Sequence, residues 1–235
     1  MYCPDQKGII ADVTQFIHKN NGNIIYIDQY VDRVYKSFFM RVVIESEFKK
    51  SSFEDFKHSF NTEIGEHYSL KCSFYLAENL PNMAVFVSKY DHCLYDILSQ
   101  QRSGKLACKI PFILSNHEDL SFIAKQFDVP FYYIPVEKND KDEAEKKQLK
   151  LLKSHKVDCI VLARYMQILS SKLLDAYPNR IINIHHSFLP AFPGAKPYHS
   201  AFERGVKIIG ATSHYVTEEL DAGPIIEQDI VRVTH

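Results

Sequence analysis

The sequence predicts a mixed α/β protein of two domains, a small α+β domain followed by a doubly wound, mostly parallel α/β domain. Two observations support this prediction. Residues 1–76 follow the pattern (β)αββαβ, and from residue 83 onward short apolar strands alternate with helices. Residues 77–82 form a polar segment with a proline, which is typical of a linker. We therefore expect domains at 1–76 and 83–235.

The elements of the first domain follow from the spacing of its apolar residues. Helical spacing from Ile9 to Lys19 ends at an Asn-Asn-Gly-Asn run, and two β-branched, aromatic runs flank a polar turn. In order, we expect a stub of strand before Pro4, a helix over Ile9–Lys19, strands over Ile24–Val31 and Ser37–Ile44, a helix from Ser51 through Phe60, and a closing strand over His67–Leu76.

The second domain is predicted from unbroken apolar strands of the kind buried in parallel sheets. The expected strands are Met83–Val87, Ile110–Leu114, Phe131–Ile134, Cys159–Leu162, Arg180–His185 and Ile225–Val233, and the expected helices are Leu94–Leu98, Asp119–Phe127 and Asp142–His155. Ligands of such sheets bind beyond the carboxyl ends of the strands, so the loops 88–90, 115–117 and 163–165 are candidate positions for a site. The charge run 137–150 predicts a solvated helix face.

Composition excludes several classes of protein. The formal charge is −1, with 28 Lys and Arg against 29 Asp and Glu, which gives no polybasic signature of a nucleic-acid or membrane binder. The five cysteines are scattered and lack a C-x-x-C pair, which favours a reducing compartment over a disulfide or zinc framework. No apolar run is long enough to span a bilayer, so we expect a cytoplasmic protein.

A candidate site lies in the last third of the chain. Side chains alternate along a strand, so Asn183 and His185 share one face of the predicted strand, while His186 points to the other face. Asp221 lies in a Leu-Asp-Ala-Gly-Pro run that predicts a loop. An amide, an imidazole and a carboxylate brought together in this way are suited to acyl chemistry, which needs a donor for the oxyanion and groups that move protons.

Three runs carry a resemblance to a known family: Asn-Ile-His-His-Ser-Phe-Leu-Pro-Ala-Phe-Pro-Gly-Ala-Lys-Pro-Tyr-His from Asn183 to His199, Gly-Ala-Thr-Ser-His-Tyr-Val from Gly210, and Asp-Ala-Gly-Pro from Asp221. Together they resemble the signature of folate-dependent formyl transfer. The resemblance spans the chain and is nearest to the deformylase branch, which hydrolyses 10-formyltetrahydrofolate to tetrahydrofolate and formate and places an ACT-like domain before a formyltransferase-like one. That branch continues past the last strand in a helical segment, so we expect the catalytic domain to be short at its C-terminal end.

The resemblance implies residue roles. Asn183, His185 and Asp221 would be catalytic, and the loop from Leu220 to Pro224 would hold the polar edge of the pteridine through its backbone. The implied folate-binding residues are Arg164, Met166, Gln167, Ile168, Leu169, His214, Leu220, Ala222 and Gly223. An alternative for the apolar residues among Met166–Leu169 is ordinary core. Folate is a substrate here, so the resemblance implies neither a cofactor nor a metal, and it implies a role in supplying formate to one-carbon and purine metabolism.

The opening Asp5-Gln6-Lys7-Gly8-Ile9 resembles the first loop of an ACT domain, a ferredoxin-like regulatory module that pairs with a copy of itself. This resemblance implies a small amino-acid effector near Asp5, Gly8 and Asn23, and a homo-oligomer, either a dimer or a tetramer. The alternative is that Gly8 serves only the turn into the helix.

The loop after the first strand of the second domain bears on the nucleophile. In the phosphate-substrate branch of the family that the chain resembles, a glycine-rich loop at this place holds the phosphorylated acceptor through close backbone N–H groups. The corresponding residues 88–92, Ser-Lys-Tyr-Asp-His, contain no glycine. Water is therefore the expected nucleophile, and a formyltransferase using the same donor is the alternative.

Two further alternatives come from other classes. The histidines near Asp221 suggest a zinc hydrolase, although none of their spacings is a recognised ligand pair. The other alternative is a folate-binding or amino-acid-sensing protein without catalytic activity. The presence of Asn183, His185 and Asp221 argues against it.

Overall fold

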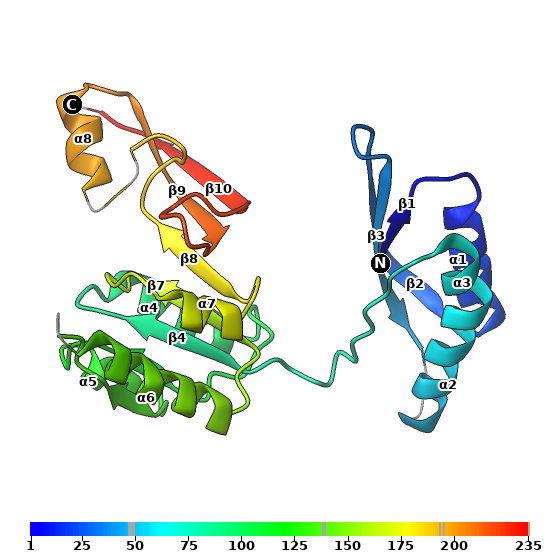
Figure 1. The fold of residues 1–235 in the computed structure, drawn as a ribbon, viewed down its shortest axis with the longest axis horizontal. Helices are drawn as coiled ribbons and strands as arrows, with labels where there is room; N and C mark the ends of the chain where they lie inside the picture. Colours follow the sequence, from blue (N-terminus) through cyan, green and yellow to red (C-terminus); the bar gives the residue numbers. More distant parts are fainter. Residues whose placement is uncertain (47–49, 138–139, 193, 195, 235) are drawn as a thin grey trace. The chain divides into compact units, whose positions relative to one another are not determined.

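The computed structural model describes residues 1–46, 50–137, 140–192, 194 and 196–234. The chain divides into two compact units, Met1–Asn79 and Leu80–His235 (Figure 1). The mixed α/β class predicted from the sequence is confirmed by both units. No helix in these described ranges is long and apolar enough to cross a membrane.

The first unit is an antiparallel sheet covered by helices. Its elements are β1 (Tyr2–Pro4), α1 (Ile9–Lys19), β2 (Asn23–Asp32), β3 (Ser37–Glu45), α2 (Lys50–Phe60), the π-helical turn η1 (Asn61–Gly65) and α3 (Glu66–Tyr68). The strands lie in the order β1-β3-β2. One face of α1 packs its apolar residues on the sheet and on α2, in a core that includes Val13, Phe16, Phe38 and Phe60.

The predicted closing strand over His67–Leu76 is wrong. The helix that starts at Lys50 continues through η1 and α3 to Tyr68, whose ring is buried and whose hydroxyl donates to the Asp12 carboxylate. Ser69 then takes a left-handed conformation with φ of 52° and ends the helix. Only Lys71 pairs with β1, as an isolated bridge to Tyr2. The burial of Tyr68 against α1 therefore outweighs the strand preference of the residues around it.

The second unit contains one sheet of seven strands in the order β10-β9-β8-β7-β4-β5-β6. Its strands are β4 (Met83–Val87), β5 (Ile113–Ser115), β6 (Phe131–Tyr133), β7 (Cys159–Ala163), β8 (Ile181–His185), β9 (Ile208–Tyr215) and β10 (Ile225–Arg232). The helices are α4 (His92–Arg102), α5 (Ser121–Gln126), α6 (Lys141–Ser154), α7 (Ser171–Ala176) and α8 (Pro197–Glu203). Strands β8, β7, β4, β5 and β6 are parallel, and β9 and β10 complete the sheet in antiparallel pairing.

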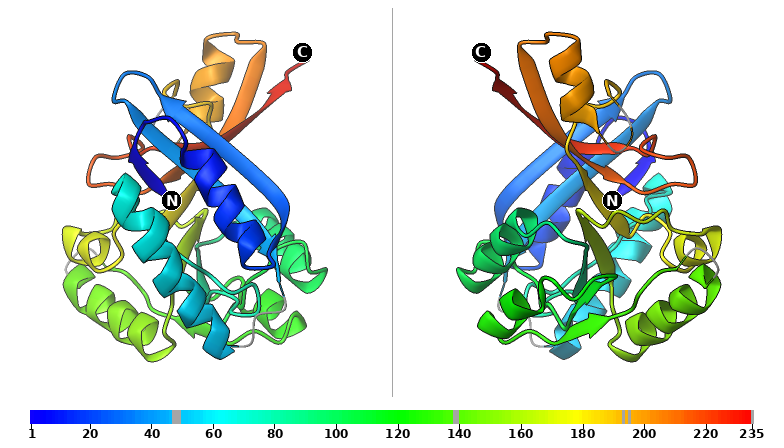
Figure 2. Two further views of the ribbon diagram at one scale, coloured as in Figure 1. Left: turned by 90° about the vertical axis from the view of Figure 1, so that its right-hand side faces the viewer. Right: turned by 90° about the vertical axis from the view of Figure 1, so that its left-hand side faces the viewer.

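Both faces of this sheet are covered, which explains the unbroken apolar strands. Along β4, Val85 and Val87 pack with α4 and α5, while Ala84 and Phe86 pack with α6 and α7. Figure 2 shows these two helix pairs on opposite sides of the sheet. The carboxyl ends of β4, β7 and β8 consequently meet at one edge, where ligands of doubly wound sheets bind.

The sequence predicts a solvated helix face for the charge run 137–150, but part of this helix is buried. Residues 138–139 lie outside the described part of the chain, but α6 buries Glu145 and Gln148 together with Ala144 and Leu152. The remaining charged residues of α6 do face solvent, including the Glu143–Lys146 ion pair. One edge of this polar helix is therefore part of the interior, and its contacts bear on the site.

Candidate active site

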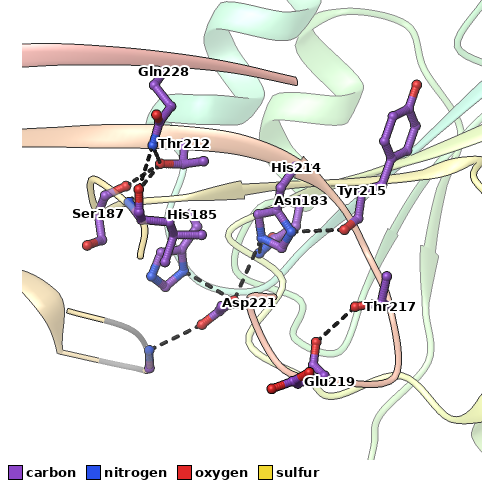
Figure 3. A network of polar contacts seen from close by, with 12 residues as sticks. Asn183, His185, Ser187, Thr212, His214, Tyr215, Thr217, Glu219, Asp221 and Gln228 are labelled. Atoms are coloured by element: carbon purple, nitrogen blue, oxygen red, sulfur yellow. Dashed lines mark hydrogen bonds and ion pairs between the residues drawn. The ribbon is translucent and has the colours of Figure 1, made fainter. Parts of the chain in front are cut away.

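Strand pairing brings an amide and two imidazoles to one face of the sheet. In the antiparallel pair β8–β9, Asn183 lies opposite His214, and His185 lies opposite Thr212. Directly opposed residues point to the same face, and alternate residues along a strand do so as well. The shared face of Asn183 and His185 predicted from the sequence is thus present, and His214 joins it (Figure 3).

Asp221 reaches these side chains from the loop between β9 and β10. One carboxylate oxygen, Oδ1, lies 3.5 Å from Nδ1 of His185 and 3.8 Å from Nε2 of His214, while Oδ2 accepts a hydrogen bond of 3.2 Å from the backbone N–H of Gly194. The Asp221 side chain is only 6% exposed, so these interactions are poorly screened by water. The backbone of Asp221 is left-handed with φ of 56°, a conformation that Asp tolerates better than most residues.

The contacts of His214 assign its tautomer. Its Nδ1 lies 3.0 Å from the carbonyl oxygen of Tyr215, which can only accept, so Nδ1 carries the hydrogen. When only Nδ1 carries a hydrogen, Nε2 is an acceptor, and it lies 3.2 Å from Nδ2 of Asn183. Asn183 therefore donates one N–H to His214 and retains a second, and its amide is held in one orientation.

His185 is buried and has one ring nitrogen without a partner among the described residues. The residue is 6% exposed, and this nitrogen is Nε2. Burial lowers the pKa of His185, and the nearby Asp221 carboxylate opposes this effect without cancelling it. A neutral imidazole that directs Nδ1–H toward Asp221 leaves a free lone pair on Nε2, which is the atom a proton acceptor requires.

A cavity of about 300 Å³ opens beside these groups. Its size is at the lower end of the range for sites that bind small molecules. It is lined by Leu162, Arg164, Tyr165, Met166, Gln167, Ile168, Leu169, Asn183, Ile184, His185, His186, Gly194, His214, Val216, Thr217, Glu218, Leu220 and Asp221. Apolar walls with a few converging polar groups are typical of sites for small organic ligands.

Most of the residues expected at the site line this cavity. They are Asn183, His185, Asp221, Arg164, Met166, Gln167, Ile168, Leu169, His214 and Leu220. Ala222 and Gly223 are not among the lining residues: Ala222 is exposed, and Gly223 is buried against the backbone of Tyr215.

In the first unit the three expected effector residues have separate contacts. The backbone N–H of Asp5 donates to Lys36, Gly8 precedes α1 with φ of 95°, and Asn23 donates to Glu45.

The expectation that His186 faces away from the site is wrong. Strand β8 ends at His185, and the chain bends at His186, so the alternation of faces stops there and His186 also lines the cavity. Burial, and secondarily the positive charge of Arg164, lower the pKa of His186 to about 4. This ring is therefore neutral at physiological pH.

Sequence reasoning missed a buried network that shapes the segment after β8. The hydroxyl of Thr212 donates to the carbonyl of Ser187 over 2.7 Å and accepts hydrogen bonds from Leu189 N–H and from Gln228 Nε2, at 3.1 and 3.0 Å (Figure 3). These partners come from three separate strands or loops, so no local pattern marks them. The network holds the segment that precedes Gly194, whose backbone N–H donates a hydrogen bond to Asp221.

The arrangement of histidines and acids does not form a metal site in the described ranges. No group of three His, Cys, Asp or Glu side chains among these residues is placed to hold a metal ion. The zinc hydrolase suggested by the histidines near Asp221 therefore has no ligand set in this part of the molecule.

Comparison with known proteins gives matches over the whole chain. Residues 81–235 match the formyl transferase family, and residues 1–50 match the ACT domain. A formyltetrahydrofolate deformylase from Synechocystis is 50% identical over 233 residues, which cover 99% of this chain and 81% of the relative. A formyltetrahydrofolate deformylase from Bacillus subtilis is 48% identical over 237 residues, covering 99% of this chain and 78% of the relative.

Solved structures agree with these matches. The crystal structure of a formyltetrahydrofolate deformylase from Pseudomonas syringae pv. tomato has a TM-score of 0.92 at 44% identity and covers 100% of this chain and 78% of its own. A glycinamide ribonucleotide transformylase from Symbiobacterium toebii has a TM-score of 0.62 at 31% identity, covering 71% of this chain and 79% of its own.

Proposed function

Since this chain belongs to the formyltetrahydrofolate deformylase family of enzymes, we propose that it hydrolyses 10-formyltetrahydrofolate to tetrahydrofolate and formate in the cavity beside Asn183, His185 and Asp221. The observation that carries this proposal is the convergence of these three side chains on one cavity, with Asp221 3.5 Å from His185. That separation is longer than a hydrogen bond, but catalytic contacts often tighten only when substrate is bound.

In the proposed reaction, water adds to the formyl carbon and gives a tetrahedral intermediate with a negatively charged oxygen. The second N–H of Asn183 is free to donate to this oxygen, because the first is held by His214. One well-placed donor of this kind contributes roughly 3 to 4 kcal/mol to lowering the barrier.

His185 moves the proton in this scheme. Its Nε2 accepts a proton from the attacking water, and the imidazolium that forms is stabilised by Asp221 beside Nδ1. The C–N10 bond then breaks, the electron pair goes to N10, and His185 returns the proton to that nitrogen. Tetrahydrofolate and formic acid are released, and the acid loses its proton to solvent.

The pteridine would lie along the loop that follows β7. Met166, Ile168 and Leu169 offer apolar contacts, and Met166 and Ile168 are 46% and 63% exposed, unlike ordinary core residues. The backbone of Leu220 and Asp221, which line the cavity, would meet the polar edge of the ring. The chemistry proposed requires only these side chains and water, with neither a cofactor nor a metal.

The pH dependence of the reaction follows from the lowered pKa of His185. The base must be neutral, so kcat/KM falls as the pH drops through the pKa of His185, and burial places this acid limb below about pH 6.5. The measurement is the initial rate of formate release at low substrate concentration, from about pH 4.5 to about pH 9, with an enzyme-free blank for chemical loss of substrate. An acid limb centred above about pH 7 would contradict a buried, neutral base.

We propose that the protein acts in the cytoplasm. Its wider role there would be to supply formate to one-carbon and purine metabolism. A reducing compartment suits the five cysteines, all of which are free thiols. The ACT unit is proposed to bind a small amino acid near Asp5, Gly8 and Asn23.

We also propose a homo-oligomer, a dimer or a tetramer. The row Tyr2, Phe39 and Tyr30 crosses the outer face of the ACT sheet, with 47%, 43% and 64% of each side chain exposed, and a second copy would cover it. A monomer at every concentration in sedimentation velocity would contradict this assembly.

A further inference from the structure

The loop Arg164–Ser170 joins β7 to α7 and forms one wall of the cavity. It has no helix or strand of its own, so its shape depends on contacts with neighbouring elements. Three buried polar side chains that do not line the cavity supply such contacts. Their role is a question separate from the chemistry at Asn183, His185 and Asp221.

The first two of these side chains lie on α6, one helical turn apart. Glu145 is 5% exposed, and its carboxyl group accepts the backbone N–H of Ser170 over 2.8 Å and the hydroxyl of the same residue through its second oxygen. Gln148 is 1% exposed, and its Nε2 donates to the hydroxyl of Tyr165 over 3.1 Å. Residues three apart share one helix face, so α6 holds the loop near both of its ends.

The third side chain comes from the end of β4. Ser88 is 3% exposed, and its hydroxyl accepts the backbone N–H of Met166 over 3.0 Å while donating to Oδ1 of Asn116 over 2.6 Å. Met166 itself lines the cavity. The middle of the loop is thereby tied to the carboxyl ends of β4 and β5.

A purely structural role explains this arrangement poorly. Burying a carboxyl group is costly unless it is fully hydrogen-bonded, and an apolar residue at Glu145 would pack α6 against the sheet without that cost. Both hydrogen-bond partners of Glu145 belong to Ser170, the residue that directly follows the lining segment Arg164–Leu169. Both buried polar side chains of α6 thus bond to the loop.

We propose that Glu145, Gln148 and Ser88 are positioning residues that hold the loop Arg164–Ser170 in the shape that binds the folate ring, with Glu145 the principal one. This inference rests on the proposed function for the identity of the ligand. None of the three touches the reacting atoms, so they act through the loop. Because the loop contacts the ring and not the formyl group, its loosening weakens binding and leaves the chemical step unchanged.

The test compares Glu145→Ala with Glu145→Gln. The glutamine keeps both contacts, since Oε1 accepts the Ser170 N–H and Nε2 donates to the Ser170 hydroxyl, whereas alanine removes both. We expect Glu145→Ala to raise KM, and the Kd for tetrahydrofolate measured by titration calorimetry, about 10- to 100-fold with kcat within about threefold of wild type. Glu145→Gln should lie within about threefold of wild type in all three quantities.

Two further variants keep the test decisive. Ser170→Ala removes only the hydroxyl contact and should raise KM by less than Glu145→Ala, so it replaces that variant if Glu145→Ala fails to fold. Ser154→Ala is the matched control, because Ser154 also lies on α6, is exposed, and bonds only within its own helix and to His155. We expect it to match wild type.

The outcomes separate positioning from structure. A lower melting temperature or a smaller active fraction with unchanged KM and Kd in both Glu145→Ala and Ser170→Ala would overturn the proposal. So would a Glu145→Gln variant as impaired as Glu145→Ala. If wild type released no formate, the proposed function would fail, but the Kd comparison for tetrahydrofolate would still confirm or overturn the positioning role by itself.

Discussion

Replacing Asp221 with asparagine is expected to lower kcat for formate release by about 10³- to 10⁴-fold and to leave KM within about threefold of wild type. The amide has nearly the same shape and can still accept the Gly194 N–H. Its NH₂ group, however, can replace the carboxylate oxygen that faces Nδ1 of His185 at 3.5 Å. The ring would then place its hydrogen on Nε2 and lose the lone pair that accepts the proton from water.

Asp175→Asn is the control for this variant. Asp175 lies on α7 and is exposed, so the same change of charge there should leave formate release unaffected. Steady-state rates for both variants are measured on the same preparation of 10-formyltetrahydrofolate. A kcat for Asp221→Asn within about tenfold of wild type would remove Asp221 from the proposed proton transfer.

Gly223→Ala is expected to displace the loop that carries Asp221. A Cβ atom at this position would lie 1.7 Å from the carbonyl oxygen of Tyr215 and 2.9 Å from its carbonyl carbon. This obstacle is backbone of β9 and is also tied by the hydrogen bond from Tyr215 N–H to Pro224, so it cannot rotate away. We expect a loss of roughly 3 kcal/mol or more in the free energy of unfolding, with kcat/KM lowered at least about 100-fold.

The matched control is Gly104→Ala. Gly104 is exposed, and nothing lies within 4 Å of an added Cβ there, but its φ of 77° is left-handed. This variant should lose only about 1 to 2 kcal/mol, the backbone cost of a side chain in that conformation, and keep full activity. Thermal unfolding and formate release are measured for both. Equal stability losses and equal activities would show that the close approach at Gly223 does not control the site.

The sequence predicts the fold class and the convergence of Asn183, His185 and Asp221 that the structure contains. Alternation of apolar strands with helices predicts the parallel sheet, and the period of two along a strand predicts that Asn183 and His185 face the same way. The Leu-Asp-Ala-Gly-Pro run correctly places Asp221 on a loop, as its backbone φ of 56° now illustrates. These are local properties of the chain, which pattern reasoning can detect.

The failures have a common physical cause, because each depends on partners distant in sequence. The charged run around Glu145 reads as a solvated face, but Ser170, 25 positions later, satisfies its carboxyl group inside the unit. The strand expected over His67–Leu76 does not form: the helix runs on to Tyr68, because this residue is buried against α1 and bonds Asp12, 56 positions earlier. The hydrogen bond from Gly194 N–H to Asp221 likewise joins residues 27 positions apart, so no local pattern predicts it.

The central claim is that this cavity delivers the formyl group to water. The most direct test supplies the enzyme with 10-formyltetrahydrofolate in the presence and absence of glycinamide ribonucleotide and measures how the formyl group divides between formate and formylated amine. We expect formate to account for all of the formyl group released, at a rate that the added acceptor does not change. Transfer to the amine at a rate faster than formate release would contradict the account.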